Sequence, residues 1–82
     1  MSKAQKILEK MRHNPKADWT IEHVRTVANA YDVIWDRPSG GSSHETYRSK
    51  SGSFRVTVVA KKPIKPIYIK FFVEFIDKVK KE

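Results

Sequence analysis

Apolar side chains recur at helical spacing near both ends of the chain. Residues three, four and seven positions apart share one helical face, and such spacing predicts amphipathic helices. The expected helices cover Lys3–His13, Ile21–Asp32 and Pro66–Lys80. Asn14-Pro15 ends the first helix, because a residue before proline is pushed out of the helical region. On the second helix, Arg25, Thr26 and Asn29 are expected to face outward.

Between the second and third helices, three short segments rich in β-branched and aromatic residues predict strands. These segments are residues 33–37, 43–49 and 54–59. In the third segment, Phe54, Val56 and Val58 alternate with Arg55 and Thr57, so the two groups point to opposite faces. Residues 38–42 predict a loop and residues 50–53 a tight turn, which makes the last two strands a hairpin.

The element order is helix, helix, three strands, helix. Sequential strands joined by short links predict a three-stranded antiparallel sheet, and the helices should pack on one face of it. The expected fold class is therefore a two-layer α+β fold. The other face of the sheet is left open to solvent or a ligand.

The charge of the chain suggests which partners it binds. The 82 residues, enough for a single domain, include 17 Lys and Arg against 9 Asp and Glu, a net charge of +8. Such a surface attracts polyanions, including RNA, or an acidic protein. There is no cysteine, no apolar stretch of about 20 residues and no signal-peptide pattern at the N-terminus. We expect a cytoplasmic protein without a membrane partner.

The candidate chemistry lies around His44. If the large Tyr47 points inward with Glu45, then His44, Thr46 and Arg48 lie on the open sheet face. His44 and Arg48 would be about 13 Å apart along the strand and would reach successive phosphates of one RNA strand. Histidine titrates near neutral pH, and metal-free RNA cleavage requires a proton donor or acceptor at the 2′- or 5′-oxygen.

Cations and backbone amides near His44 are the expected RNA contacts. Glycine lets backbone amides approach a phosphate closely, and lysines beside a helix N-terminus favour phosphate binding. The RNA-binding candidates are Arg37, Gly41, Ser42, Ser43, Arg48, Lys61, Lys62 and Lys65. No cofactor and no metal are expected, because the three histidines match no zinc pattern.

The segment Gly41-Ser42-Ser43-His44, followed by Tyr47, resembles a motif of the HicA-like messenger-RNA interferase toxins. Members carry Gly-Ser-His at the start of a strand, a nearby aromatic residue, a Val-rich strand, and a basic or proline-containing link to a closing helix. The corresponding residues are Gly41-Ser42-Ser43-His44, Tyr47, Arg55-Val56-Thr57-Val58 and Lys61–Pro66. Ser42 stands where the family usually has glycine, and the Val-Pro pair common after the third strand is missing here.

The resemblance implies a fold like a double-stranded-RNA-binding domain, with residues 19–80 as the family core and residues 1–18 as an added N-terminal helix. It implies a toxin endoribonuclease that cuts messenger RNA through one catalytic histidine, here His44. It also implies silencing by a partner antitoxin of the HicB type.

Other interpretations stay open beside this one. A non-catalytic module that binds double-stranded RNA by its shape fits the fold and the charge equally well, and a protein-interaction domain is a third possibility. A serine–histidine dyad is disfavoured because Ser43 and His44 point to opposite faces. Trp19 and Trp35 are expected in the core rather than stacked on bases.

Overall fold

The computed structural model describes residues 3–36, 44–61 and 63–81. Within these ranges the chain forms three helices and three strands, in the order expected from the sequence. They are α1 (Lys3–His13), α2 (Ile21–Ala30), β1 (Ile34–Asp36), β2 (His44–Arg48), β3 (Arg55–Val59) and α3 (Pro66–Lys81). None of these helices is long and apolar enough to cross a membrane.

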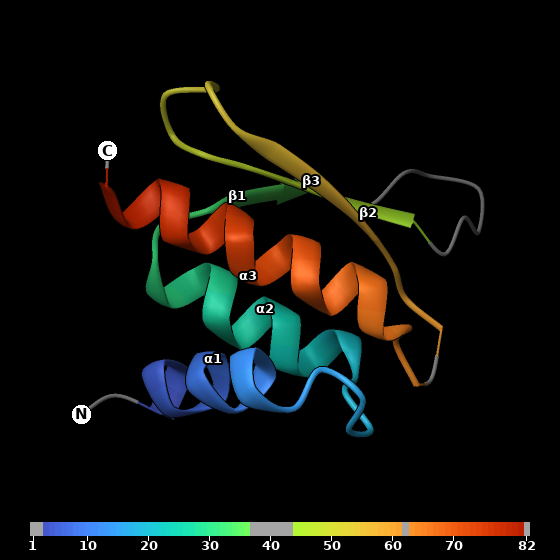
Figure 1. Ribbon diagram of the computed structural model, residues 1–82. Coiled ribbons are helices and arrows are strands. Elements are labelled where there is room, and N and C mark those ends of the chain that lie inside the picture. Colours follow the sequence, from blue (N-terminus) through green and yellow to red (C-terminus); the bar gives the residue numbers. More distant parts are fainter. Residues whose placement is uncertain (1–2, 37–43, 62, 82) are drawn as a thin grey trace.

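The three strands form one antiparallel sheet in the order β1-β2-β3, with β2 in the centre. α2 contacts β1 and α3 contacts β3 on the same face of the sheet, while α1 packs against α2 and α3 on their far side (Figure 1). The predicted α+β fold, with a three-stranded antiparallel sheet and helices on one face, is confirmed. The opposite face of the sheet carries no helix among the described residues (Figure 1).

All three helices and the sheet contribute to one hydrophobic core. Tyr47 of β2 and Phe72 of α3 are its largest fully buried side chains, and their rings meet edge to face with centroids 5.6 Å apart. Leu8 and Met11 of α1 are also fully buried in this cluster. Burial of such side chains is the main favourable contribution to folding. The N-terminal helix α1 therefore shares the core that supports the sheet.

The start of α2 is fixed by a capping box. Thr20 is the N-cap, and its backbone N–H donates to Nδ1 of His23 over 3.1 Å. Trp19 is buried, as expected, and its indole N–H donates to the carbonyl of Asn14 over 2.9 Å. The imidazole of His23 thus stabilises the N-terminus of α2, which gives this histidine a structural role.

An ion pair joins α1 to α3 at the surface. The Arg12 guanidinium donates two hydrogen bonds to the Asp77 carboxylate, at 2.6 and 2.7 Å. The hydrogen bond from Arg12 is the largest cause that lowers the pKa of Asp77 below its usual value. A carboxyl group with a lowered pKa in the folded state adds stability above its unfolded pKa and loses it as the pH falls through the folded pKa.

We expect Asp77→Asn to lower the free energy of unfolding at pH 7 by less than about 1 kcal/mol, because the pair is partly exposed. The difference between wild type and variant should be smaller at pH 2.5, because the contribution of a carboxyl group with a lowered folded pKa declines as the pH falls. Urea unfolding at the two pH values measures this difference. A difference that stays constant between them would contradict the assigned role of the ion pair.

Candidate functional site

His44 is the first residue of β2, and its side chain is exposed. Along this strand Glu45 and Tyr47 are fully buried, whereas His44 and Arg48 are exposed and Thr46 is half-buried. The alternation follows from the pleat of a strand that has one face against the core. The prediction that His44 and Arg48 lie on the open face of the sheet is confirmed.

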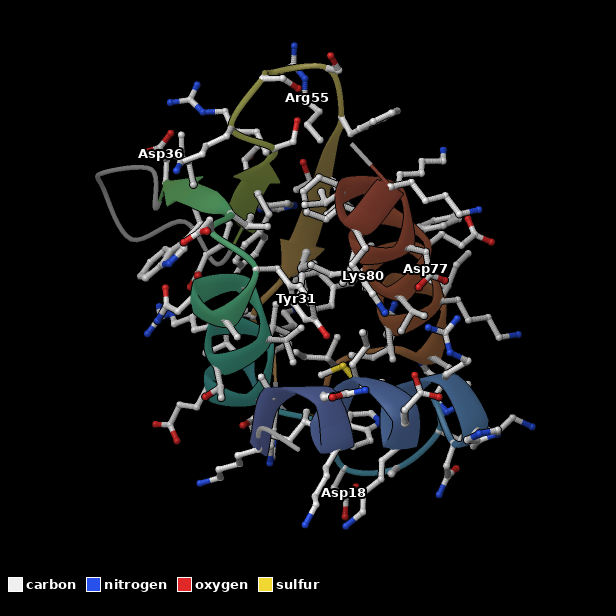
Figure 2. All side chains as sticks on the ribbon, turned by 90° about the vertical axis from the view of Figure 1, so that its left-hand side faces the viewer. Asp18, Tyr31, Asp36, Arg55, Asp77 and Lys80 are labelled. Atoms are coloured by element: carbon white, nitrogen blue, oxygen red, sulfur yellow. The ribbon has the colours of Figure 1, made fainter. Side chains whose placement is uncertain are left out.

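The hairpin between β2 and β3 places a second arginine beside the first. Gly52 in the turn has a φ of 80°, a conformation that favours glycine. The register sets Arg48 directly opposite Arg55, and both side chains are exposed. Arg55 lies beside the hairpin turn at the sheet end of the molecule (Figure 2). Like charges in directly opposed positions destabilise a sheet. A phosphate bound between the two guanidinium groups would relieve this repulsion.

One acidic residue lies on the same face. The Asp36 carboxylate of β1 is 3.5 Å from the guanidinium of Arg48, and both side chains are more than half exposed. An ion pair of this kind contributes little to stability and is screened by salt. Arg48 can therefore leave its ion pair with Asp36 and bind a phosphate at little cost in free energy.

Directly behind His44, a buried ion pair anchors β2 to the helices. The Glu45 carboxylate accepts hydrogen bonds from Arg25 of α2 at 2.6 and 3.2 Å and from the Tyr47 hydroxyl at 2.9 Å. The expectation that Arg25 faces outward is therefore wrong. The hydrogen bond with Glu45 is the largest cause that raises the pKa of Arg25, while burial is the largest cause that raises the pKa of Tyr47.

The same arginine links α2 to β1. The Arg25 guanidinium lies over the Trp35 ring, 4.8 Å from the ring centroid, in a cation–π contact. The Trp35 indole N–H donates to the Asn29 side-chain oxygen over 3.2 Å, and the ring packs against the edge of the core. Arg25 therefore links Glu45 of β2 to both α2 and β1. These contacts hold the backbone of β2 in place next to His44.

Two of the predicted phosphate-binding lysines follow the end of β3. His44 is opposite Val59 in the sheet, and Lys61 comes two residues after Val59 in the chain. Lys65 immediately precedes the first residue of α3, and both lysines are exposed. The remaining candidates, Arg37, Gly41, Ser42, Ser43 and Lys62, lie outside the described residues.

No protein-family model, curated protein or solved structure matches this chain. The resemblance to the HicA-like toxins therefore rests on the sequence motif and the order of the elements, and it stays a prediction.

Two outward residues of this face, Arg55 and Thr57, were not among the candidates drawn from the sequence. The alternation of residues 54–58 already assigned both to the outer side, and Thr57 lies opposite Thr46 in the sheet. The length of the hairpin turn sets the register, and the register decides which residue of β2 lies opposite Arg55 and Thr57. This signal could have identified both residues from the sequence. Within the described ranges, no group of three or more His, Asp or Glu side chains is placed to hold a metal ion.

Proposed function

We propose that this protein is a metal-independent endoribonuclease, a messenger-RNA interferase toxin in which His44 is the catalytic residue. The observation that carries the proposal is the position of His44. It is exposed at the start of β2, on the open sheet face that also presents Arg48 and Arg55. A titratable side chain and two cations on one uncovered surface are what cleavage of a polyanion without metal requires.

In the proposed reaction, the 2′-oxygen of a ribose attacks the adjacent phosphorus and the bond to the 5′-oxygen breaks. The imidazole of His44 either takes the proton from the 2′-hydroxyl or gives one to the leaving 5′-oxygen. The products are a 2′,3′-cyclic phosphate and a 5′-hydroxyl. Arg48 is four residues further along the strand, about 13 Å away. It therefore binds a neighbouring phosphate, and Lys61 adds positive charge at the His44 end of the sheet.

The proposal includes a partner and a compartment. A ribonuclease that cuts cellular messenger RNA needs an inhibitor, and we propose a HicB-type antitoxin in the cytoplasm. The net charge of +8 favours a partner with an acidic surface, because opposite charges speed encounter. An antitoxin that bound this chain tightly and left its RNA cleavage unchanged would contradict that role.

The test uses a defined single-stranded RNA incubated with the purified protein in excess EDTA. A second RNA of the same sequence carries 2′-deoxyribose at the mapped cleavage position. The first RNA should be cut and the second should stay intact at that position, because the attacking 2′-oxygen is missing. Equal cleavage of both RNAs would contradict the proposed mechanism.

A non-catalytic RNA-binding module is the second candidate. The opposed pair of Arg48 and Arg55 favours it as much as it favours the nuclease, since the pair binds phosphate without any chemistry. RNA that is bound and remains intact in the assay above would support this module.

A further inference from the structure

A groove outside the proposed catalytic position lies between β3 and α3. It has a volume of about 420 Å³, and β3 and the hairpin turn form one side and the outer face of α3 the other. We call it the β3–α3 groove, and the residues that matter here are Phe54, Arg55, Phe71, Glu74, Phe75 and Lys78. Its volume lies in the range of sites that bind small organic groups.

Aromatic side chains dominate the apolar part of the groove. Phe75 is buried and Phe54 is half-buried, so these two rings form its floor. Phe71 is 48% exposed, an unusual position for a phenylalanine on a helix that buries its other apolar face in the core. An exposed ring beside a groove offers a flat surface on which a nucleobase can stack.

Two cations border the same groove. The ammonium group of Lys78 lies 5.8 Å from the centroid of the Phe54 ring, which keeps it near the aromatic floor. Arg55 is among the residues that line the groove, and its side chain lies on the open sheet face opposite Arg48, so the groove meets the proposed RNA surface at the edge strand β3. Glu74 is the one acidic residue of the lining, and its carboxylate suits the amino group of a base rather than a phosphate.

The edge of the sheet adds backbone hydrogen-bonding groups. β3 is an outer strand of the sheet, and the Ser49 N–H donates to the Phe54 carbonyl over 2.9 Å. Residues of an antiparallel pair alternate between groups that face the partner strand and groups that face away. The backbone N–H and C=O of Arg55 and Thr57 therefore point to the open edge beside the groove, where they can meet the edge of a base.

We propose that the β3–α3 groove binds one unpaired nucleobase of the RNA, which stacks on Phe71 while Arg55 and Lys78 contact the flanking phosphates. This inference rests on the proposed function, because it takes RNA as the ligand. The combination of exposed ring, two cations and outward backbone groups matches the contacts by which proteins hold single-stranded RNA. The groove lies at the Arg55 end of β3, whereas His44 lies beside Val59 at the other end. It therefore holds a nucleotide a short distance from the cleavage position.

The test measures the affinity of the full chain for a short single-stranded RNA made uncleavable by 2′-O-methyl groups. Phe71→Ala should weaken binding roughly five-fold or more, the effect expected for the loss of one stacked base. Phe71→Trp should keep or improve the affinity. The matched control is Ile67→Ala, which removes an apolar side chain of similar exposure, 53% against 48%, one helical turn away and outside the groove. This control should leave the affinity unchanged.

A second arm replaces each base of the RNA in turn by an abasic sugar. Wild type should lose affinity at one position, and Phe71→Ala should show no further loss there, because the stacking partner is already gone. Wild type that binds no RNA would defeat the proposed function itself. Equal affinity of wild type and Phe71→Ala for RNA would overturn only the proposal that the β3–α3 groove binds a nucleobase. Loss of affinity for an acidic inhibitor protein with unchanged affinity for RNA would likewise overturn it, by assigning the groove to a protein partner.

Discussion

His44→Ala is expected to slow RNA cleavage by roughly 10²–10⁴-fold, the usual contribution of a positioned acid or base. The imidazole is exposed at the end of a strand and packs into no core, so its removal should leave the fold intact. RNA affinity should also stay close to that of wild type, because the arginines of the open face remain. The expected effect is therefore on the chemical step.

Single-turnover cleavage with saturating protein measures that step, and fluorescence anisotropy with uncleavable RNA measures binding. The matched control is His13→Ala, since His13 is likewise exposed but lies at the end of α1, on the far side of the helical layer from the sheet. His13→Ala should cleave at the wild-type rate. Equal rate constants for both alanine variants and wild type would remove His44 from the reaction.

Arg25→Ala is expected to lower the free energy of unfolding by about 3 kcal/mol, the low end of the range for breaking a buried ion pair. The substitution removes the guanidinium that donates two hydrogen bonds from α2 to the carboxylate of Glu45. This carboxylate is fully buried. It also removes the cation over Trp35. The low end applies because the Arg25 side chain is itself 27% exposed, so water reaches the site when it is shortened.

Two controls separate this effect from general damage. Arg12→Ala breaks the pair with Asp77, which is partly exposed, and should cost about 1 kcal/mol or less. The double variant Arg25→Met with Glu45→Leu replaces both charges by apolar groups and should recover most of the stability lost in Arg25→Ala. Denaturant unfolding compares the four proteins. A loss for Arg25→Ala no larger than that for Arg12→Ala would contradict the proposed role of the buried pair.

Local patterns were enough to predict the elements and the open face. The helical spacing of apolar residues that predicted α3 corresponds to a buried face, because Ile69, Phe72 and Ile76 are all fully buried. The alternation around Tyr47 correctly placed His44 and Arg48 on the outside. Both patterns involve residues that are close in the sequence, and the regular period of a helix or strand places such residues on one face.

The features that the sequence did not predict depend on contacts between distant segments. Arg25 stands between Val24 and Thr26 in α2, and nothing in this local pattern separates it from a cation that faces solvent. Its pairing with Glu45, 20 residues later, holds it against the core. Phe75 is also buried, and its burial depends on the packing of β3 against α3. The β3–α3 groove also requires the packing of a helix against a strand, which no local pattern specifies.

The most direct test of the central claim is mass spectrometry of the fragments from one defined RNA. The RNA is incubated in excess EDTA with wild type and, separately, with His44→Ala. We predict fragments ending in 2′,3′-cyclic phosphate and beginning with 5′-hydroxyl from wild type, and intact RNA from the variant. The same fragments from both proteins, or intact RNA from both, would contradict a metal-independent nuclease centred on His44.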